Sequence, residues 1–151
     1  MQEAFRIRAI AQGDPLWAPT AAFAHACSWR AGPVLAGRMR RGEFLPWERV
    51  IVAERQGSIA GYCTLCATDE LPEDCGLTPF IGFVFVDESA RGHRLSQRML
   101  ACAAKYAASL GFRRVHVISG EVGLYEKFGF TKIGEVQSIH GTTEQLFVRD
   151  L

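Results

Sequence analysis

The segment Phe80–Val86 is almost entirely apolar, and it constrains the fold more than any other part of the chain. Such a run is typical of a central strand that is buried on both faces of a sheet. The next segment, Leu95–Leu110, has apolar residues at steps of three and four, which predicts an amphipathic helix that ends at Gly111. Val115–Ile118 is again short and apolar. Residues 80–118 therefore predict a strand–helix–strand unit with short connections.

The segments on either side of this unit predict further strands and helices. Alternating or apolar runs indicate strands at Phe5–Ile10, Val50–Ala53, Ser58–Leu65, Thr131–Ile139 and Thr143–Val148. Helical patterns cover Trp17–Arg30, Val34–Arg41 and Gly123–Phe130. We therefore expect one mixed α/β domain over residues 1–151, in which a central sheet of about 6–7 strands is flanked by about four helices.

Composition and charge exclude several classes of protein. Hydrophobic residues make up 48% of the chain, and 17 Lys and Arg face 16 Asp and Glu, which leaves a net charge of +1. This balance excludes a disordered chain and gives no support for a nucleic-acid partner, which would need a strongly basic surface. The longest apolar run is far shorter than the roughly 20 residues of a membrane span.

Cysteine usage and the first residues indicate the compartment. Met1–Arg8 lacks the apolar stretch of a secretory signal, and the chain has five cysteines, an odd number. This favours free thiols in a reducing cytoplasm. Cys63 and Cys66 form a Cys-x-x-Cys pair, but there is no second pair to complete a zinc site. We interpret them as buried thiols and expect no metal.

The junction between the apolar strand and the long helix has positive charge in an unusual place. A helix N-terminus carries unpaired N–H groups and a partial positive charge, so acidic residues are favoured there. This chain instead has Arg91, His93, Arg94 and Arg98. A bound diphosphate would supply the missing negative charge and accept the free N–H groups. The alternative is a turn with solvated arginines.

A second candidate segment is Leu124-Tyr125-Glu126-Lys127-Phe128-Gly129-Phe130. By itself it predicts no more than a packed tyrosine in a short helix. In combination with Arg91-Gly92-x-x-x-Ser96 at a helix start, and with the hairpin Val52–Tyr62, it resembles the GNAT superfamily of N-acetyltransferases. The resemblance extends over nearly the whole chain and is most specific at residues 50–62, 80–98 and 119–134.

The resemblance implies a splayed sheet with acetyl-CoA, and no metal, in the splay. Backbone groups of the strand before the loop would bind the pantetheine arm, which corresponds here to Val84, Phe85 and Val86. The pyrophosphate loop corresponds to Arg91, Gly92, His93, Arg94, Leu95 and Ser96. Arg94 and Ser96 stand at the two positions where the family has glycines, which let the backbone approach phosphate closely. Arg94 would therefore contact phosphate through its side chain instead, or point away.

The resemblance also implies catalytic roles. Tyr125 would be the general acid that returns a proton to the departing CoA thiolate, and Ser119 would take part of the role of a family asparagine. His116 is the candidate general base, because its intrinsic pKa suits neutral pH. Glu121 or a chain of water molecules is the competing base, and a structural histidine is the alternative for His116.

The implied activity is acetyl-CoA-dependent N-acetyl transfer to a primary amine of a small molecule or peptide, directly within a ternary complex. The alternative is a CoA-binding or regulatory module with little turnover. One or two of Trp17, Trp29 and Trp47 would line the acceptor pocket, although core packing is the more common role of a tryptophan. We expect neither a nucleic-acid nor a membrane partner, and we allow for a homodimer.

Overall fold

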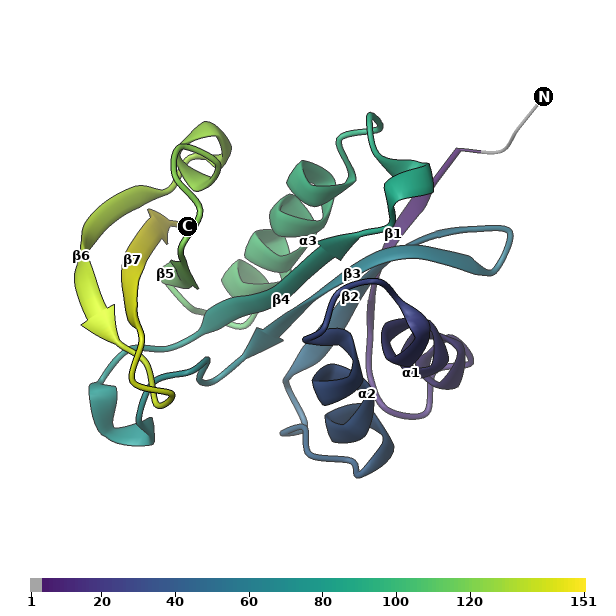
Figure 1. Ribbon diagram of the computed structural model, residues 1–151, viewed down its shortest axis with the longest axis horizontal. Helices are drawn as coiled ribbons and strands as arrows, with labels where there is room; N and C mark the ends of the chain where they lie inside the picture. The colour runs from purple at the N-terminus through teal and green to yellow at the C-terminus, as the bar shows by residue number, and fades with distance from the viewer. Residues whose placement is uncertain (1–3) are drawn as a thin grey trace.

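Seven strands form one mixed sheet in the order β1-β2-β3-β4-β5-β7-β6 (Figure 1). The computed structural model describes residues 4–151, so the first three residues of the segment Met1–Arg8, from which the compartment was predicted, lie outside the described part. The strands are β1 (Arg6–Ile10), β2 (Arg49–Arg55), β3 (Ser58–Cys66), β4 (Phe80–Val86), β5 (Arg114–Ser119), β6 (Thr131–Gln137) and β7 (Thr143–Asp150).

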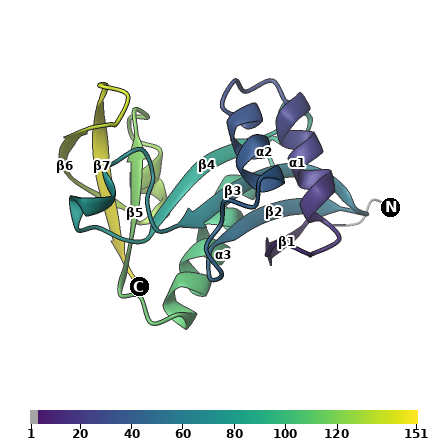
Figure 2. The ribbon, with the colours of Figure 1, turned by 90° about the horizontal axis from the view of Figure 1, so that it is seen from below.

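Three α-helices cover the two faces of this sheet: α1 (Trp17–Ala26), α2 (Gly32–Arg40) and α3 (Leu95–Ser109). Figure 2 shows α3 on one face and the pair α1 and α2 on the other. The predicted stripe of α3 packs with β2, β4 and β5 in one core cluster, whose fully buried members include Ile51, Ile81, Met99 and Val115. A second cluster joins α1 and α2 to the opposite face of β2, β3 and β4. The strand–helix–strand prediction is therefore confirmed.

Two predicted helices differ from the structure. The helix expected over residues 17–30 ends at Ala26, and α2 begins at Gly32. A Cβ atom on Gly32 would lie only 2.2 Å from the carbonyl oxygen of Ala24, so this glycine lets the start of α2 contact the last turn of α1. The helix expected over residues 123–130 is a short 3-10 helix at Tyr125–Phe128. Residues 4–151 thus contain three α-helices rather than about four.

The strands β4 and β5 run parallel but separate soon after they begin. They pair only at Phe80 with His116 and at Ile81 with Val117. Beyond that point β4 continues along β3, and β5 continues along β7. Within residues 4–151, the backbone edge of β4 after Ile81 therefore has no strand partner on the β5 side. This divergence is the splay that the resemblance implied.

The prediction of free, buried thiols is met within residues 4–151. The five cysteines are all free, and Cys63 and Cys66 are buried. Burial raises the pKa of the Cys66 thiol to about 12, so this thiol stays protonated at neutral pH. No helix in the described part of the chain is long and apolar enough to cross a membrane.

Candidate active site

A cavity of about 840 Å³ opens where β4 and β5 diverge. Its walls come from five places in the sequence: β4 itself, the loop and first turn of α3, the end of β5 with Tyr125, the loop between α1 and α2, and the loop between β3 and β4. The cavity therefore lies in the splay, and segments from most of the chain contribute to it.

The N-terminus of α3 forms one part of this wall. The first turn contains no acidic residue, and no side chain caps it. The N–H of Arg98 donates to the carbonyl of Arg94 at 3.0 Å and is the first intrahelical donor, so the N–H groups of Leu95, Ser96 and Gln97, which precede it, have no acceptor within the helix. These three residues line the cavity. The helix thus presents free donors and its positive dipole end to whatever the cavity binds.

Arg94 has an unusual backbone conformation at its position in the loop. Its backbone is left-handed, with φ of 57°, which is the conformation that glycine adopts most readily. The chain therefore makes a glycine-like turn here with an arginine. Arg91, Gly92 and Arg94 line the cavity with the helix start.

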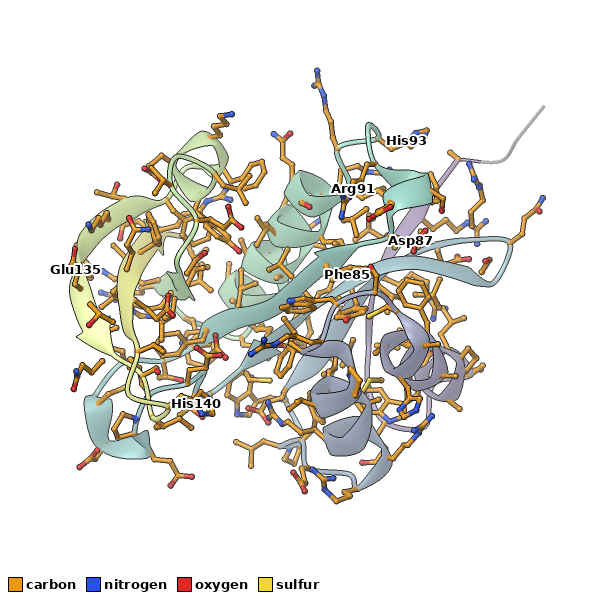
Figure 3. All side chains as sticks on the ribbon, viewed as in Figure 1. Phe85, Asp87, Arg91, His93, Glu135 and His140 are labelled. Atoms are coloured by element: carbon orange, nitrogen blue, oxygen red, sulfur yellow. The ribbon has the colours of Figure 1, made fainter. Side chains whose placement is uncertain are left out.

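His93 and Arg98 are directed elsewhere. The ring of His93 packs against Phe5 with 5.1 Å between centroids, and His93 is not among the cavity-lining residues. Figure 3 shows His93 with Arg91 on the loop that follows β4. The Nη2 atom of Arg98 donates to the carbonyl of Phe5 at 2.9 Å. Both residues connect the loop and α3 to the start of the chain. The binding role predicted for His93 thus has no support from its position.

The residues predicted on β4 line the cavity from both sides of the strand. Val84, Phe85 and Val86 all contribute. Val84 and Val86 pack toward the α3 cluster, and Phe85 belongs to the cluster under α1 and α2. The unpaired backbone edge of β4 follows the same wall, so its N–H and C=O groups are available for a ligand that lies along the strand.

Tyr125 lies in the wall opposite β4, at the start of the 3-10 helix. It is buried, and its ring packs against Phe130 and Phe147 at 5.9 and 5.6 Å between centroids. Burial, together with the charges of nearby Glu121 and Asp69, raises the pKa of the Tyr125 phenol, and a hydrogen bond with the Ser119 side chain lowers it. The net direction is upward, so the phenol keeps its proton at neutral pH and can donate it.

His116 is not part of this wall. It is buried, with 5% of its surface exposed, and its Nδ1 atom lies 3.0 Å from the carbonyl oxygen of Pro79. Because a carbonyl only accepts, Nδ1 carries the proton in the neutral ring. The ring also lies against Phe80. These contacts hold the His116 side chain against Pro79 and Phe80, outside the cavity. Its predicted role as base therefore has no support from geometry.

Asp69 is a cavity residue that the sequence patterns did not single out. It follows β3, in a segment where the sequence predicts neither a strand nor a helix, and it lines the cavity with Glu70 and Glu121. Burial raises the pKa of Asp69 to about 7. The available signal was an acidic residue soon after a buried strand, but this pattern is too common in loops to indicate a site.

Among the tryptophans, Trp29 lines the cavity. Trp17 is buried and donates from Nε1 to the carbonyl of Met39 at 3.1 Å, and Trp47 packs on Phe112. Of the three tryptophans, only Trp29 therefore lies where it can contact a bound ligand, and its place in an acceptor pocket stays a prediction. Within residues 4–151 no group of three or more His, Cys, Asp or Glu side chains is arranged to hold a metal ion.

Comparison with known proteins places this geometry in a family. Residues 17–130 match the model of the acetyltransferase (GNAT) family. No curated protein sequence matches the chain.

Solved structures share the fold at low sequence identity. An aminoglycoside 6'-N-acetyltransferase from Enterococcus faecium superposes with a TM-score of 0.72 at 13% identity over 96% of both chains. A GNAT family N-acetyltransferase from Escherichia coli, in complex with CoA, has a TM-score of 0.69 at 22% identity, over 99% of this chain and 84% of the other. A GNAT family acetyltransferase from Elizabethkingia anophelis with acetyl-CoA bound has a TM-score of 0.61 at 15% identity, over 99% of this chain and all of the other.

Proposed function

This chain belongs to the acetyltransferase (GNAT) family, and we propose that it is an N-acetyltransferase. It transfers an acetyl group from acetyl-CoA to a primary amine of a small molecule or peptide, directly within a ternary complex. Two of the similar structures contain CoA or acetyl-CoA, and a third is an acetyltransferase of aminoglycosides, which supports this donor and an amine acceptor.

The distribution of charge along the cavity carries the proposal. At the carboxyl end of β4 the cavity is lined by Arg91, Arg94 and the free N–H groups of α3. Near the start of β4 it is lined by Asp69 and Glu70, which belong to the loop that precedes this strand. Figure 1 shows the two loops at opposite ends of β4. A cavity with one cationic and one anionic end suits an anionic donor and a cationic acceptor.

The donor end matches the parts of acetyl-CoA. The free N–H groups at α3, with Arg91 and Arg94, would take the pyrophosphate charge. The unpaired backbone edge at Val84 and Val86 would pair with the amides of the pantetheine arm, as an added strand does. The thioester then lies in the splay, where Tyr125 forms the opposite wall.

Tyr125 and the lack of a cysteine in the cavity wall of the described residues support direct transfer. No cysteine lines the cavity within residues 4–151, so no thiol is placed to form an acyl-enzyme. The acceptor nitrogen attacks the thioester carbonyl, the C–S bond breaks, and the phenol of Tyr125 gives its proton to the CoA thiolate. The raised pKa of this phenol keeps it in the protonated form that the step requires.

A thiol-release assay with acetyl-CoA and a panel of small amines, polyamines and peptides tests the proposal. We expect release with at least one amine and a product that is heavier by one acetyl group. If CoA raises the Tm but no amine in the panel is acetylated, the chain is a CoA-binding module and the proposed transfer is wrong.

A further inference from the structure

The carboxyl group of Asp69 lies directly against β4 at the point where that strand leaves β5. A Cβ atom on Gly82 would lie 2.9 Å from Oδ2 and 3.1 Å from Oδ1 of Asp69. The carboxylate therefore occupies the space that any larger residue at position 82 would fill. Gly82 follows Ile81, the last residue of β4 that pairs with β5. Asp69 is thus held at the apex of the splay, in the wall of the cavity.

Within residues 4–151 no hydrogen-bond donor contacts the carboxylate of Asp69, although the side chain is only partly exposed. Buried carboxylates normally accept several hydrogen bonds or pair with a cation, because an unpaired buried charge is unfavourable. Glu48 shows the usual arrangement, since its two oxygens accept from the N–H groups of Leu45 and Ala67 at 2.7 and 2.6 Å. Asp69 therefore keeps its acceptor capacity free for a group that enters the cavity.

The charged and titratable groups around Asp69 come from four elements. Glu70 on the same loop raises the pKa of Asp69, and Arg38 on α2 lowers it, while burial has the largest effect. Arg38 is held over the rings of Phe44 and Phe83, so it screens the carboxylate without pairing with it. Cys66 on β3 and Tyr125 both have their pKa raised by Asp69. The result is a carboxyl group with a pKa of about 7, which takes up and releases protons near neutral pH.

From this arrangement we infer that Asp69 is the general base that removes the proton from the acceptor's ammonium group. The inference rests on the proposed function. It names the residue that makes the acceptor amine reactive by deprotonating it. Three observations support this inference. The carboxylate is unpaired, it lies at the apex of the splay, and it is near Tyr125. His116 is buried outside the cavity with Nδ1 on a carbonyl.

The proton transfers balance with these two residues. The ammonium group gives its first proton to Asp69, which releases it to solvent, and the neutral amine then attacks the thioester carbonyl. As the new C–N bond forms and the C–S bond breaks, the nitrogen gives a second proton to the ionised Asp69, and the thiolate takes one from Tyr125. Asp69 then releases this second proton, and Tyr125 regains one from solvent. The net products are an amide, a thiol and one free proton.

The pH dependence of Asp69→Asn tests the inference with an amine that the wild type acetylates. We expect wild-type kcat/KM to rise with pH up to about 7 and then to level. Asn has similar volume but accepts no proton, so Asp69→Asn should lower kcat/KM by roughly 100-fold or more at pH 8 and remove this acidic limb. The CoA-induced rise in Tm should remain. Glu73→Gln, an exposed charge change on the same loop, is the matched control with a wild-type profile.

Gly82→Ala provides a second variant in which the carboxylate is kept but displaced. Its methyl group would lie 2.9 Å from Oδ2, so the Asp69 side chain must turn away. We expect kcat/KM to fall at every pH, with the acidic limb retained at a shifted pKa. If Asp69→Asn fails to fold, an unchanged profile in Gly82→Ala overturns the inference and a shifted limb supports it.

The two proposals fail in different ways. A wild type that acetylates no amine removes the proposed function, and with it the inference. A wild type that acetylates an amine, combined with an Asp69→Asn variant that keeps its acidic limb and its rate, leaves the function intact and overturns the role of Asp69. An acidic limb that disappears in His116→Ala but not in Asp69→Asn would assign the base to His116.

Discussion

The indole ring of Trp29 stacks on the phenyl ring of Phe85, with 5.9 Å between centroids and 5° between the ring planes. Trp29 lies in the loop between α1 and α2, and Phe85 lies on β4. The contact therefore attaches the first helices to the strand that we propose carries the donor. Both residues line the cavity, so this pair forms an aromatic part of its wall.

Replacing Trp29 with alanine should weaken acceptor binding more than chemistry. The variant loses the stacked wall, so we expect KM for the amine to rise about tenfold or more with a smaller change in kcat. Trp47→Ala is the matched control, because Trp47 packs on Phe112 away from the cavity. It should lower the Tm and leave KM unchanged. Equal KM values in the two variants would contradict the prediction that Trp29 contacts the acceptor.

Arg91→Glu should abolish most of the rise in Tm that CoA produces. The substitution places a negative charge beside the free N–H groups of α3, where the pyrophosphate is expected to bind. Differential scanning fluorimetry with millimolar CoA measures the effect. Arg113→Glu makes the same charge change at an exposed position near the other end of α3 and should keep the full shift. A full shift in Arg91→Glu would contradict the phosphate site.

Tyr125→Phe should lower kcat by roughly 10- to 1000-fold, the range of a lost general acid. The ring contacts with Phe130 and Phe147 do not involve the hydroxyl group, so the fold and the CoA-induced Tm shift should remain. Single-turnover kinetics isolates the chemical step. An unchanged rate of that step would return Tyr125 to a packing role.

Asp69→Asn should raise the stability of the protein above neutral pH. The pKa of Asp69 is about 7 in the folded chain against an ordinary value of 3.8, so between these values the folded state binds a proton that the unfolded state does not. Stability of the wild type therefore falls as pH rises through this window, and the full penalty is present above pH 7. We expect Asp69→Asn to be more stable by about 2 kcal/mol at pH 8, or roughly 6 °C in Tm.

Thermal unfolding at a series of pH values measures that difference. The gain of Asp69→Asn over the wild type should grow between pH 4 and 7 and level above it, with no difference near pH 4. A constant difference across this range would mean that the carboxyl group does not titrate near neutral pH.

His116→Ala should destabilise the fold by about 2–4 kcal/mol, because it removes a buried ring and its hydrogen bond to Pro79. We expect the acidic limb of kcat/KM to survive, since the ring lies outside the cavity. Denaturant unfolding and a pH–rate profile check the two parts. A variant of normal stability that has lost the limb would support the base role predicted from the sequence.

The sequence by itself determined the features that depend on local order along the chain. The apolar run Phe80–Val86 and the stripe of α3 follow from residue periodicity, because burial on one or two faces leaves a pattern within a few residues. The cationic helix start at Arg91 and Arg94 was also visible, since a helix N-terminus and its charges are neighbours in sequence. Tyr125 was identified only through the resemblance to a family, because one tyrosine in a short helix has no local signal of its own.

The tertiary structure decided which side chains meet across distant segments. Asp69 became part of the site because the loop after β3 returns over Gly82 on β4, a contact that no local pattern encodes. His93 and His116 were both plausible by position, but one packs on Phe5 and the other binds the Pro79 carbonyl. The physical reason is that a side chain's direction and burial depend on strands and loops brought together by the whole sheet. Local sequence sets which elements form, whereas the divergence of β4 from β5 sets which residues face the cavity.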